Sequence, residues 1–333
     1  MLYRWQAAMG AVSGALVAEA LANQSPLWGG YGDQMLAAAE RLLSGSPVDI
    51  DLKPTHSIAT AIGVAGTGTP LLLDQTTAAL IDIVNTGLGS PVPIGSTDPL
   101  LAKALDAAQQ HPFEDAVRAA GGDIDLAMLT GMFVGLYGGL GAVPARLVSQ
   151  VRNTEDTRGR RYIANLVNRL LGTEKPNWYD PRQRRGPKEV LPGLWVSNLY
   201  GHSQFVADHP DGLVLSLCNE EGRLAGHPNH ITFHLEDAPK TDANPSVELV
   251  VDEVLREIAA ARQAGRPVLL HCRHGASRTG LILRLILVEE LDVSASDALT
   301  EAQCLWPHTS SWNMAWNDLV ERRAQTVGAT AVS

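Results

Sequence analysis

The sequence contains few cysteines, no excess of basic residues and no long apolar segment. Its three cysteines, Cys218, Cys272 and Cys304, form neither a CxxC pair nor a disulfide framework, and such sparse use is typical of a reducing compartment. The formal charge of −10 argues against a nucleic acid as the main partner, because phosphate backbones are bound by clustered Lys and Arg. No stretch is long and apolar enough to span a membrane. We therefore expect a cytoplasmic protein that binds neither nucleic acid nor membranes.

Internal repeats and low-complexity tracts are also missing, and the main feature is a change of sequence character near the middle of the chain. A length of 333 residues suggests two domains, and 45% hydrophobic with 19% charged residues indicates a globular protein. Residues 1–150 predict a helical domain and residues 189–325 an α/β domain. Residues 151–188 predict a basic, partly helical linker that ends in a Pro- and Arg-rich stretch.

Few aromatic or β-branched runs interrupt the first 150 residues. Segments such as "GDQMLAAAERLLSG", "TTAALIDIVNTGL" and "IDLAMLTGMFVGLYGGLG" are rich in Ala and Leu and are separated by Gly, Pro and Ser, so we predict an all-α domain. The opening segment has an A-x-A-like site at Ala18–Ala20 and can be read as a signal peptide. We favour a buried helix in which Gly10 and Gly14 allow a second helix to approach closely.

Short strands and longer helices alternate after residue 189. The runs "GLWVS", "GLVLSLC", "ITFHLE" and "PVLLHC" are rich in Val, Leu and Ile and are bounded by turn residues, which is typical of strands. Between them, "SVELVVDEVLREIAAARQAG" has apolar residues at three- and four-residue spacing, as in an amphipathic helix. This alternation predicts a mainly parallel central sheet flanked by helices.

The stretch "HCRHGASRTG" at residues 271–280 joins a predicted buried strand to a predicted helix. Ligands bind at the carboxyl ends of strands in such sheets, and a helix N-terminus there offers unpaired N–H groups to an anion. Gly275 lets the backbone bend so that its amides converge, and Arg278 can grip phosphate oxygens with two parallel N–H groups. The same positive environment favours the thiolate form of Cys272. The pattern therefore predicts a site that holds a phosphate next to a nucleophilic thiolate.

Cleavage of a phosphoester also needs a general acid, because the leaving oxygen must take up a proton. Two candidates lie upstream in "FHLEDAPKTDANP": Asp237, which follows a predicted strand, and Asp242, five residues later on the same loop. The residues leave this choice open. Such a step needs no metal or organic cofactor, and we read the histidines of "GHPNH" as part of a solvated turn rather than a zinc site. Cys218 is assigned to the core and Cys304 to helix packing.

These motifs make the segment from about 189 to 325 resemble dual-specificity, protein-tyrosine-phosphatase-like enzymes. The resemblance is carried by "VLPGLWVSN", "LVLSLC", the loop with Asp237, "HCRHGASRTG" and "SASDALTEAQCLWP". It implies that Cys272 is the nucleophile and Arg278 the phosphate clamp. It also implies that Asp237 is the acid and that Thr279 helps the thiolate to leave.

The resemblance implies roles for the rest of the loop as well. His271 would tune the environment of the cysteine, and five residues would supply the backbone amides that bind the substrate. These five are Arg273, His274, Gly275, Ala276 and Ser277. Lipid-phosphate members of the family often carry lysines inside this loop, and none is present here. Phosphorylated proteins or peptides are therefore the expected substrates.

The N-terminal half resembles a second family, the ADP-ribosylglycohydrolases, through "GALVAEAL", "GYGDQMLAAAERLL" and "AAGGDIDLAMLTGMFVGLYGGLGAVP". That family holds two Mg²⁺ ions with oxygen ligands. Asp123 and Asp125 stand at two of the ligand positions and are weak metal candidates. Tyr31 and Gly32 stand where the family has a pair of acids, and Glu19 stands where the family has an aspartate. The resemblance therefore implies a degenerate domain without the hydrolase chemistry. In the alternative interpretation, Asp123 is simply a helix N-cap and Asp125 lies in the first turn.

The sequence thus predicts a cysteine-dependent phosphatase that hydrolyses phosphomonoesters through a phosphocysteine intermediate. Two alternatives stay open. One is a regulatory protein that captures phosphorylated or ADP-ribosylated ligands without turnover. The other is ADP-ribosylglycohydrolase activity in the N-terminal domain.

Overall fold

The structure, a computed structural model, describes residues 4–43, 84, 98–152, 159–171, 185–218 and 227–330. The chain divides into two compact units, Met1–Asn177 and Trp178–Ser333. Most of the helix predicted over "TTAALIDIVNTGL" lies outside the described residues. Within the parts of the chain that are described, no helix has both the length and the hydropathy needed to cross a membrane.

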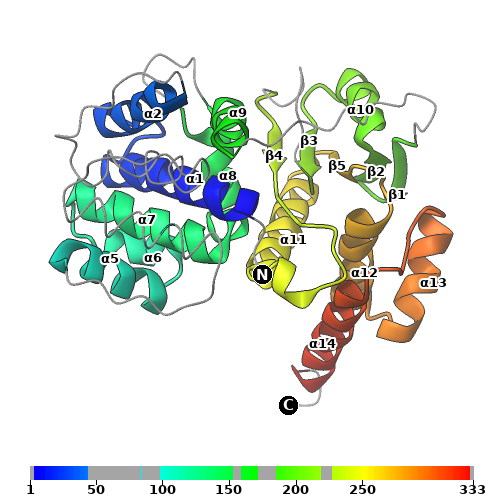
Figure 1. The fold of residues 1–333 in the computed structure, drawn as a ribbon. Coiled ribbons are helices and arrows are strands. Elements are labelled where there is room, and N and C mark those ends of the chain that lie inside the picture. Colours follow the sequence, from blue (N-terminus) through cyan, green and yellow to red (C-terminus); the bar gives the residue numbers. More distant parts are fainter. Residues whose placement is uncertain are drawn as a thin grey trace. The chain divides into compact units, whose positions relative to one another are not determined.

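The regular elements described in the first unit are all helices (Figure 1). They are α1 (Arg4–Ala22), α2 (Gly30–Leu43), α5 (Pro99–Gln110), α6 (Phe113–Arg118), α7 (Ile124–Gly138), a 3₁₀ turn (Leu140–Ala142), α8 (Ala145–Gln150) and α9 (Arg160–Leu170). Sequence signals mark several of their ends: Asp98 caps α5 by accepting hydrogen bonds from Leu100 N and Leu101 N, and Pro99 occupies the first turn.

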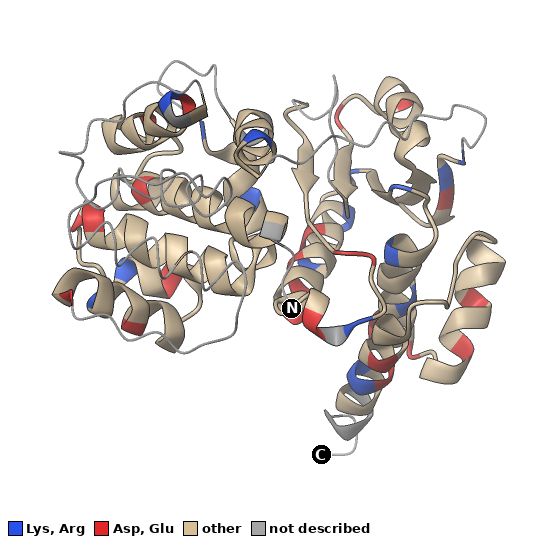
Figure 2. Ribbon diagram, in the orientation of Figure 1, with Lys and Arg blue, Asp and Glu red and all other residues tan. Residues whose placement is uncertain are grey.

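Helices α1 and α7 form the centre of this unit and pack with their backbones in contact. A Cβ atom added at Gly135 would lie 1.9 Å from the carbonyl oxygen of Gly10, and one added at Gly14 would lie 2.1 Å from that of Gly131. Helix α7 is uncharged after its first turn (Figure 2), as expected for a helix that is buried along most of its length. The predicted close approach at Gly10 and Gly14 is therefore confirmed.

We expect Gly135→Ala to destabilise the protein strongly. The added methyl group overlaps the carbonyl of Gly10, so the two helices must move apart, and overpacking of a core costs about 1–3 kcal/mol or more. Urea unfolding followed by circular dichroism measures the loss. Gly30→Ala is the matched control, because its Cβ meets no atom within 4 Å. Equal midpoints for the two variants would contradict the backbone contact.

The second unit is built on a five-stranded sheet with the order β1-β2-β5-β3-β4. The strands are β1 (Lys188–Leu191), β2 (Leu194–Asn198), β3 (Leu213–Ser216), β4 (His230–Thr232) and β5 (Val268–Cys272). Among the strand pairs of the described residues, β1–β2 is antiparallel and the other three are parallel, so the predicted mainly parallel sheet is confirmed. Every residue of the central strand β5 is buried, which explains its continuous apolar run.

Of the α-helices described in this unit, two connect strands of the sheet and three follow its last strand (Figure 1). They are α10 (His202–Asp208), α11 (Val247–Gln263), α12 (Ser277–Leu291), α13 (Ala295–Leu305) and α14 (Met314–Thr330). The side chain of Phe205 on α10 packs with Val214 of β3 and Leu269 of β5. Helix α11 turns Val250, Val254 and other apolar residues at helical spacing into the core.

Candidate active site

Cys272 is the last residue of β5, between β2 and β3 in the middle of the sheet, and only 1% of it is exposed. Four residues separate it from Ser277, where α12 begins. Gly275 has a φ of +65°, and a Cβ there would lie 2.6 Å from the carbonyl oxygen of Ser197. Glycine is therefore required for the loop to turn against the end of β2. The first N–H groups of α12 lack partners within the helix and, with the helix dipole, favour an anion at the loop.

Arg278 lies in the first turn of α12 with 8% of it exposed. Its Nη1 donates hydrogen bonds to the carbonyl oxygens of Leu217 (3.3 Å) and Leu235 (3.0 Å), which hold the guanidinium in place. Its Nε has no hydrogen-bond acceptor among the described residues. Burial lowers the pKa of Arg278, but the charges of Cys272 and its other acidic neighbours outweigh burial, so the net shift of this pKa is upward. The arginine is therefore a buried, permanent cation beside the cysteine.

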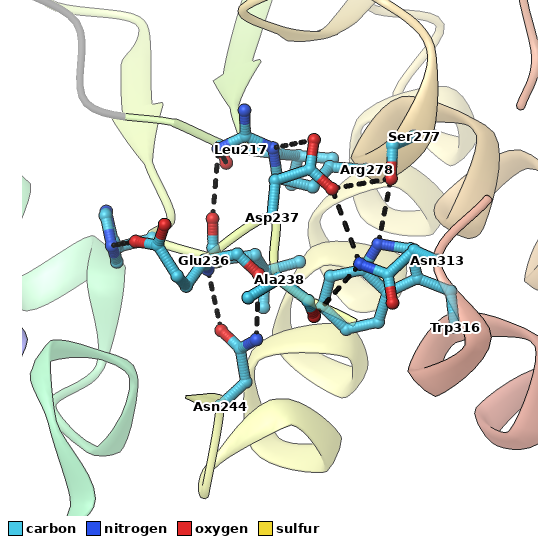
Figure 3. Close-up of polar contacts among 11 residues, drawn as sticks. Leu217, Glu236, Asp237, Ala238, Asn244, Ser277, Arg278, Asn313 and Trp316 are labelled. Atoms are coloured by element: carbon cyan, nitrogen blue, oxygen red, sulfur yellow. Dashed lines mark hydrogen bonds and ion pairs between the residues drawn. The ribbon is translucent and has the colours of Figure 1, made fainter. Parts of the chain in front are cut away.

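Asp237 is the acid that the structure brings to this loop (Figure 3). Its Oδ1 accepts a hydrogen bond of 2.7 Å from the hydroxyl of Ser277, and its Oδ2 lies 3.6 Å from Nε of Arg278. The side chain is 23% exposed, so it lies at the surface of the site. Asp242 lies in a separate 3₁₀ turn, Thr241–Ala243, and is exposed. Asp237 is therefore the candidate acid whose contacts with the loop are established.

The position of Asp237 differs in one respect from the prediction. The run "ITFHLE" was expected to be a strand to its end, but β4 stops at Thr232. Phe233 N still donates to the carbonyl of Ser216, after which the chain leaves the sheet. Two hydrogen bonds between Glu236 and the side chain of Asn244, of 2.7 and 2.9 Å, then fix the loop. Asp237 is therefore positioned by the hydrogen bonds between Asn244 and the neighbouring Glu236, and not by the end of a strand.

Three residues that the sequence reasoning did not single out complete the surroundings of the loop. Asn313 donates to Asp237 Oδ1 (3.4 Å) and to the carbonyl of Ala238 (3.2 Å). The indole N–H groups of Trp316 and Trp306 donate to Ser277 Oγ and to the carbonyl of Gly275. A buried indole usually has a hydrogen-bond partner, so the closely spaced tryptophans of "LWPHTSSWNMAW" were the available signal.

The other loop residues differ in exposure. Ser277 and Thr279 are buried, Arg273 and Ala276 are half-buried, and His274 is exposed. Among the described residues, no partner accepts or donates a hydrogen bond at Thr279 Oγ1. Although the residue is exposed, partial desolvation of its ring lowers the pKa of His274, and the nearby arginines lower it further, which favours the neutral imidazole at neutral pH.

His271 belongs to a buried cluster behind the loop. The hydroxyl of Ser216 lies 2.5 Å from Nε2 of His271 and 2.7 Å from Nε2 of His230. The ring of His202 lies 5.2 Å from each of these two imidazoles. The interpretation of "GHPNH" as a solvated turn is therefore wrong for His230, which is a buried residue of β4 whose imidazole contacts Ser216 of the neighbouring strand β3.

The two remaining cysteines lie in different environments. Cys218 is buried just beyond β3, as predicted for a core residue. Cys304 is exposed on α13, so its assignment to helix packing is wrong. Helix α13 turns Ala298 and Ala302 inward instead, and Cys304 falls on the other face.

The three acids compared above with metal-ligand positions, Asp123, Asp125 and Glu19, lie at or against helix ends. Asp123 Oδ1 accepts a hydrogen bond of 3.1 Å from Leu126 N and caps α7, while Asp125 lies in the first turn. Glu19 is fully buried and accepts hydrogen bonds from Tyr31 N and Gly32 N at the start of α2, and burial raises its pKa. Within the described ranges, no group of three or more His, Cys, Asp or Glu side chains is arranged to hold a metal ion.

No protein-family model matches the chain. Solved structures that are similar to part of it include human DUSP28, which is 17% identical with a TM-score of 0.36, over 42% of this chain and 93% of that chain. P. aeruginosa TpbA is 23% identical with a TM-score of 0.34, over 45% and 94%. The human tyrosine phosphatase-like serine/threonine/tyrosine-interacting protein is 15% identical with a TM-score of 0.36, over 45% and 98%. These similarities concern the fold of less than half of the chain, so function must be inferred from the side chains of the site.

Proposed function

We propose that the second unit is a cysteine-dependent phosphatase that hydrolyses phosphomonoesters of proteins or peptides. One observation carries the proposal: Asp237 lies 35 positions before Cys272 in the chain, yet its carboxylate contacts Ser277 and lies 3.6 Å from Arg278. A thiol, a fixed guanidinium and a carboxyl group around one loop are the three groups that phosphoryl transfer through a cysteine requires.

The proposed reaction has two steps. In the first, the Cys272 thiolate attacks phosphorus and the ester P–O bond breaks, while Asp237 donates its proton to the leaving oxygen. In the second, water attacks phosphorus, Asp237 takes up a proton from that water and the S–P bond breaks. The hydroxyl of Thr279 donates a hydrogen bond to the departing thiolate. Arg278 binds two of the equatorial oxygens in both transition states through its fork of N–H groups.

The burial of Cys272 fits this chemistry. With only 1% of the residue exposed, the thiol is accessible only to a compact group that enters the loop. A phosphoryl group on an extended side chain meets this requirement. The loop interior of Arg, His, Gly, Ala and Ser has no lysine, and we therefore favour phosphoprotein substrates over phospholipids.

The test is hydrolysis of an aryl phosphate in EDTA and a reductant, with Arg278→Lys as the diagnostic variant. Lysine keeps the charge but loses the planar fork, and loss of one transition-state donor lowers kcat by about 10²–10³-fold. Arg284→Lys is the matched control: Arg284 is also buried on α12, but its Nη1 donates to Asn317 Oδ1 on α14. We expect the control to keep its kcat.

The outcomes separate the candidate functions. A protein without turnover that still binds phosphate through the loop would be the capture protein left open by the sequence. Equal kcat values for Arg278→Lys and Arg284→Lys would show that Arg278 only supports the carbonyls of Leu217 and Leu235.

A further inference from the structure

Two exposed apolar side chains, Trp312 and Met314, lie on either side of Asn313 in the chain. Trp312 is 52% exposed and Met314 is 60% exposed, whereas Asn313 and Ala315 are buried. Among the tryptophans that the structure describes, none but Trp312 is exposed. The segment that leads into α14 therefore turns alternate residues into the protein and leaves an indole and a thioether in solvent.

This exposed pair lies close to the candidate acid. The side chain of Asn313 donates to Asp237 Oδ1 at 3.4 Å (Figure 3). Neighbouring Cα atoms are 3.8 Å apart, so the Cα of Trp312 lies within about 11 Å of that carboxylate oxygen. An extended peptide covers about 3.3–3.6 Å per residue. The indole is therefore close enough to contact a substrate residue within about three positions of the phosphorylated one.

Hydrogen bonds on both sides of Trp312 fix the backbone that carries it. The side-chain amide of Asn317 donates to the carbonyl of Ser311 (3.1 Å), and Asn313 Oδ1 accepts from Ala315 N (3.1 Å). A tryptophan on a fixed backbone has few side-chain torsions to lose when it binds a partner. The indole is thus prepared for contact at a small cost in conformational entropy.

The proposed reaction places a peptide over this part of the surface. Because only 1% of Cys272 is exposed, the phosphoryl group must enter the loop on its side chain while the peptide backbone stays outside. Tryptophan is the residue type that most often dominates the energy of binding surfaces, and the flexible thioether of methionine adapts to apolar partners. An apolar side chain of the substrate therefore suits Trp312 and Met314.

We propose that Trp312 and Met314 form a platform that binds an apolar side chain of the substrate, within about three positions of its phosphorylated residue. The inference rests on the proposed phosphatase function and narrows it to proteins or peptides with a leucine-like residue near the phosphate. Trp312 is then a specificity-determining residue that contributes to substrate binding and takes no part in the chemical steps.

The experiment compares two phosphotyrosine peptides of equal length and charge as substrates of the full-length protein. One peptide has leucine at the three positions on each side of the phosphotyrosine, and the other has asparagine there. We expect kcat/KM to be about tenfold to a hundredfold higher for the leucine peptide, the gain typical of burying one large apolar side chain. Trp312→Ala should remove most of this preference, and Trp312→Phe should keep part of it.

Leu291→Ala is the matched control. Leu291 is also exposed, by 51%, but it ends α12, whose first residue, Ser277, borders the loop. A helix of 15 residues is about 22 Å long, so Leu291 is far from the site. The control should keep the preference of the wild-type protein. Phenyl phosphate is the third substrate, because its poor leaving group reports whether a variant disturbs the acid.

The failures of the two proposals differ. If the wild-type protein hydrolyses both peptides equally well, or if Trp312→Ala keeps the preference, the platform is wrong while the phosphatase proposal stands. If Trp312→Ala lowers kcat/KM for phenyl phosphate as much as for the leucine peptide, the indole only supports Asn313 and the platform is also wrong. If none of the three substrates is hydrolysed, the phosphatase proposal fails, and equal affinities for the two peptides in calorimetry would reject the platform too.

The same variant tests a second copy of the chain as the occupant of the platform. Light scattering gives the mass of the wild-type protein and of Trp312→Ala in solution, and we expect the two masses to be equal. A dimer that is lost in Trp312→Ala would assign the platform to an interface between two copies and overturn the proposal.

Discussion

Replacement of Cys272 by serine is expected to abolish hydrolysis of aryl phosphates and phosphopeptides. A serine hydroxyl is a poor nucleophile without an adjacent general base, and in the proposed mechanism the carboxyl of Asp237, which contacts Ser277, serves the leaving group instead. The loss should exceed that of any other single substitution, because no phosphoenzyme can form. Release of inorganic phosphate, followed to a small fraction of one turnover, measures it.

The matched control for this prediction is Cys304→Ser, which makes the same change at an exposed cysteine on α13. It should leave kcat and KM unchanged. Cys272→Ser should still bind substrate. Because the variant cannot cleave the phosphoester, we expect it to retain a bound phosphopeptide. Residual turnover in Cys272→Ser above that of contaminating phosphatases would exclude the phosphocysteine mechanism.

Asp237→Asn is expected to lower kcat by about 10²–10⁴-fold for phosphotyrosine, the contribution typical of a general acid. The loss should be much smaller for an aryl phosphate with an activated leaving group, which needs little protonation. The basic limb of the pH–rate profile should flatten as well, because that limb reports loss of the proton from the acid. Steady-state kinetics with the two substrates over a range of pH measure all three effects.

Asp242→Asn is the control for this second prediction, since it changes an exposed aspartate of the neighbouring 3₁₀ turn. It should keep both the kcat values and the pH profile. If the leaving-group-dependent loss occurs in Asp242→Asn and not in Asp237→Asn, the roles of the two aspartates are exchanged. If it occurs in neither, the acid is another residue.

The strand–loop–helix unit around Cys272 could be predicted because local residues determine it. The continuous apolar run of β5 fits a central strand buried on both faces, Gly275 allows the positive φ, and α12 follows at once. The helical first unit was predictable for a similar reason. Its small residues occur at helical spacing, and Gly10 and Gly14 do contact α7.

The surroundings of the site could not be predicted, because they depend on residues far apart in the chain. Asp237 and Asp242 have similar local sequences, and the contacts of Asp237 with Ser277 and Asn313 come from residues that follow much later in the chain. The burial of His230 follows from the pairing of β4 with β3. A strand as short as β4 carries no sequence pattern that indicates its partner strand. A turn-like sequence such as "GHPNH" therefore gave no sign of a buried imidazole.

The support of the loop by Asn313 and Trp316 has a consequence for protein synthesis. The ribosome makes the chain from its N-terminus, so Cys272 and Arg278 emerge while the residues that hold Asp237 and Ser277 have not yet been added. Trp316 is in the first turns of α14, the last helix of the chain that the structure describes. A nascent chain that ends before Asn313 and this helix contains Cys272 and Arg278 but lacks the hydrogen bonds that Asn313 and Trp316 make to Asp237 and Ser277. The loop therefore reaches its final form only after residues 313–316 have been added and have folded against it.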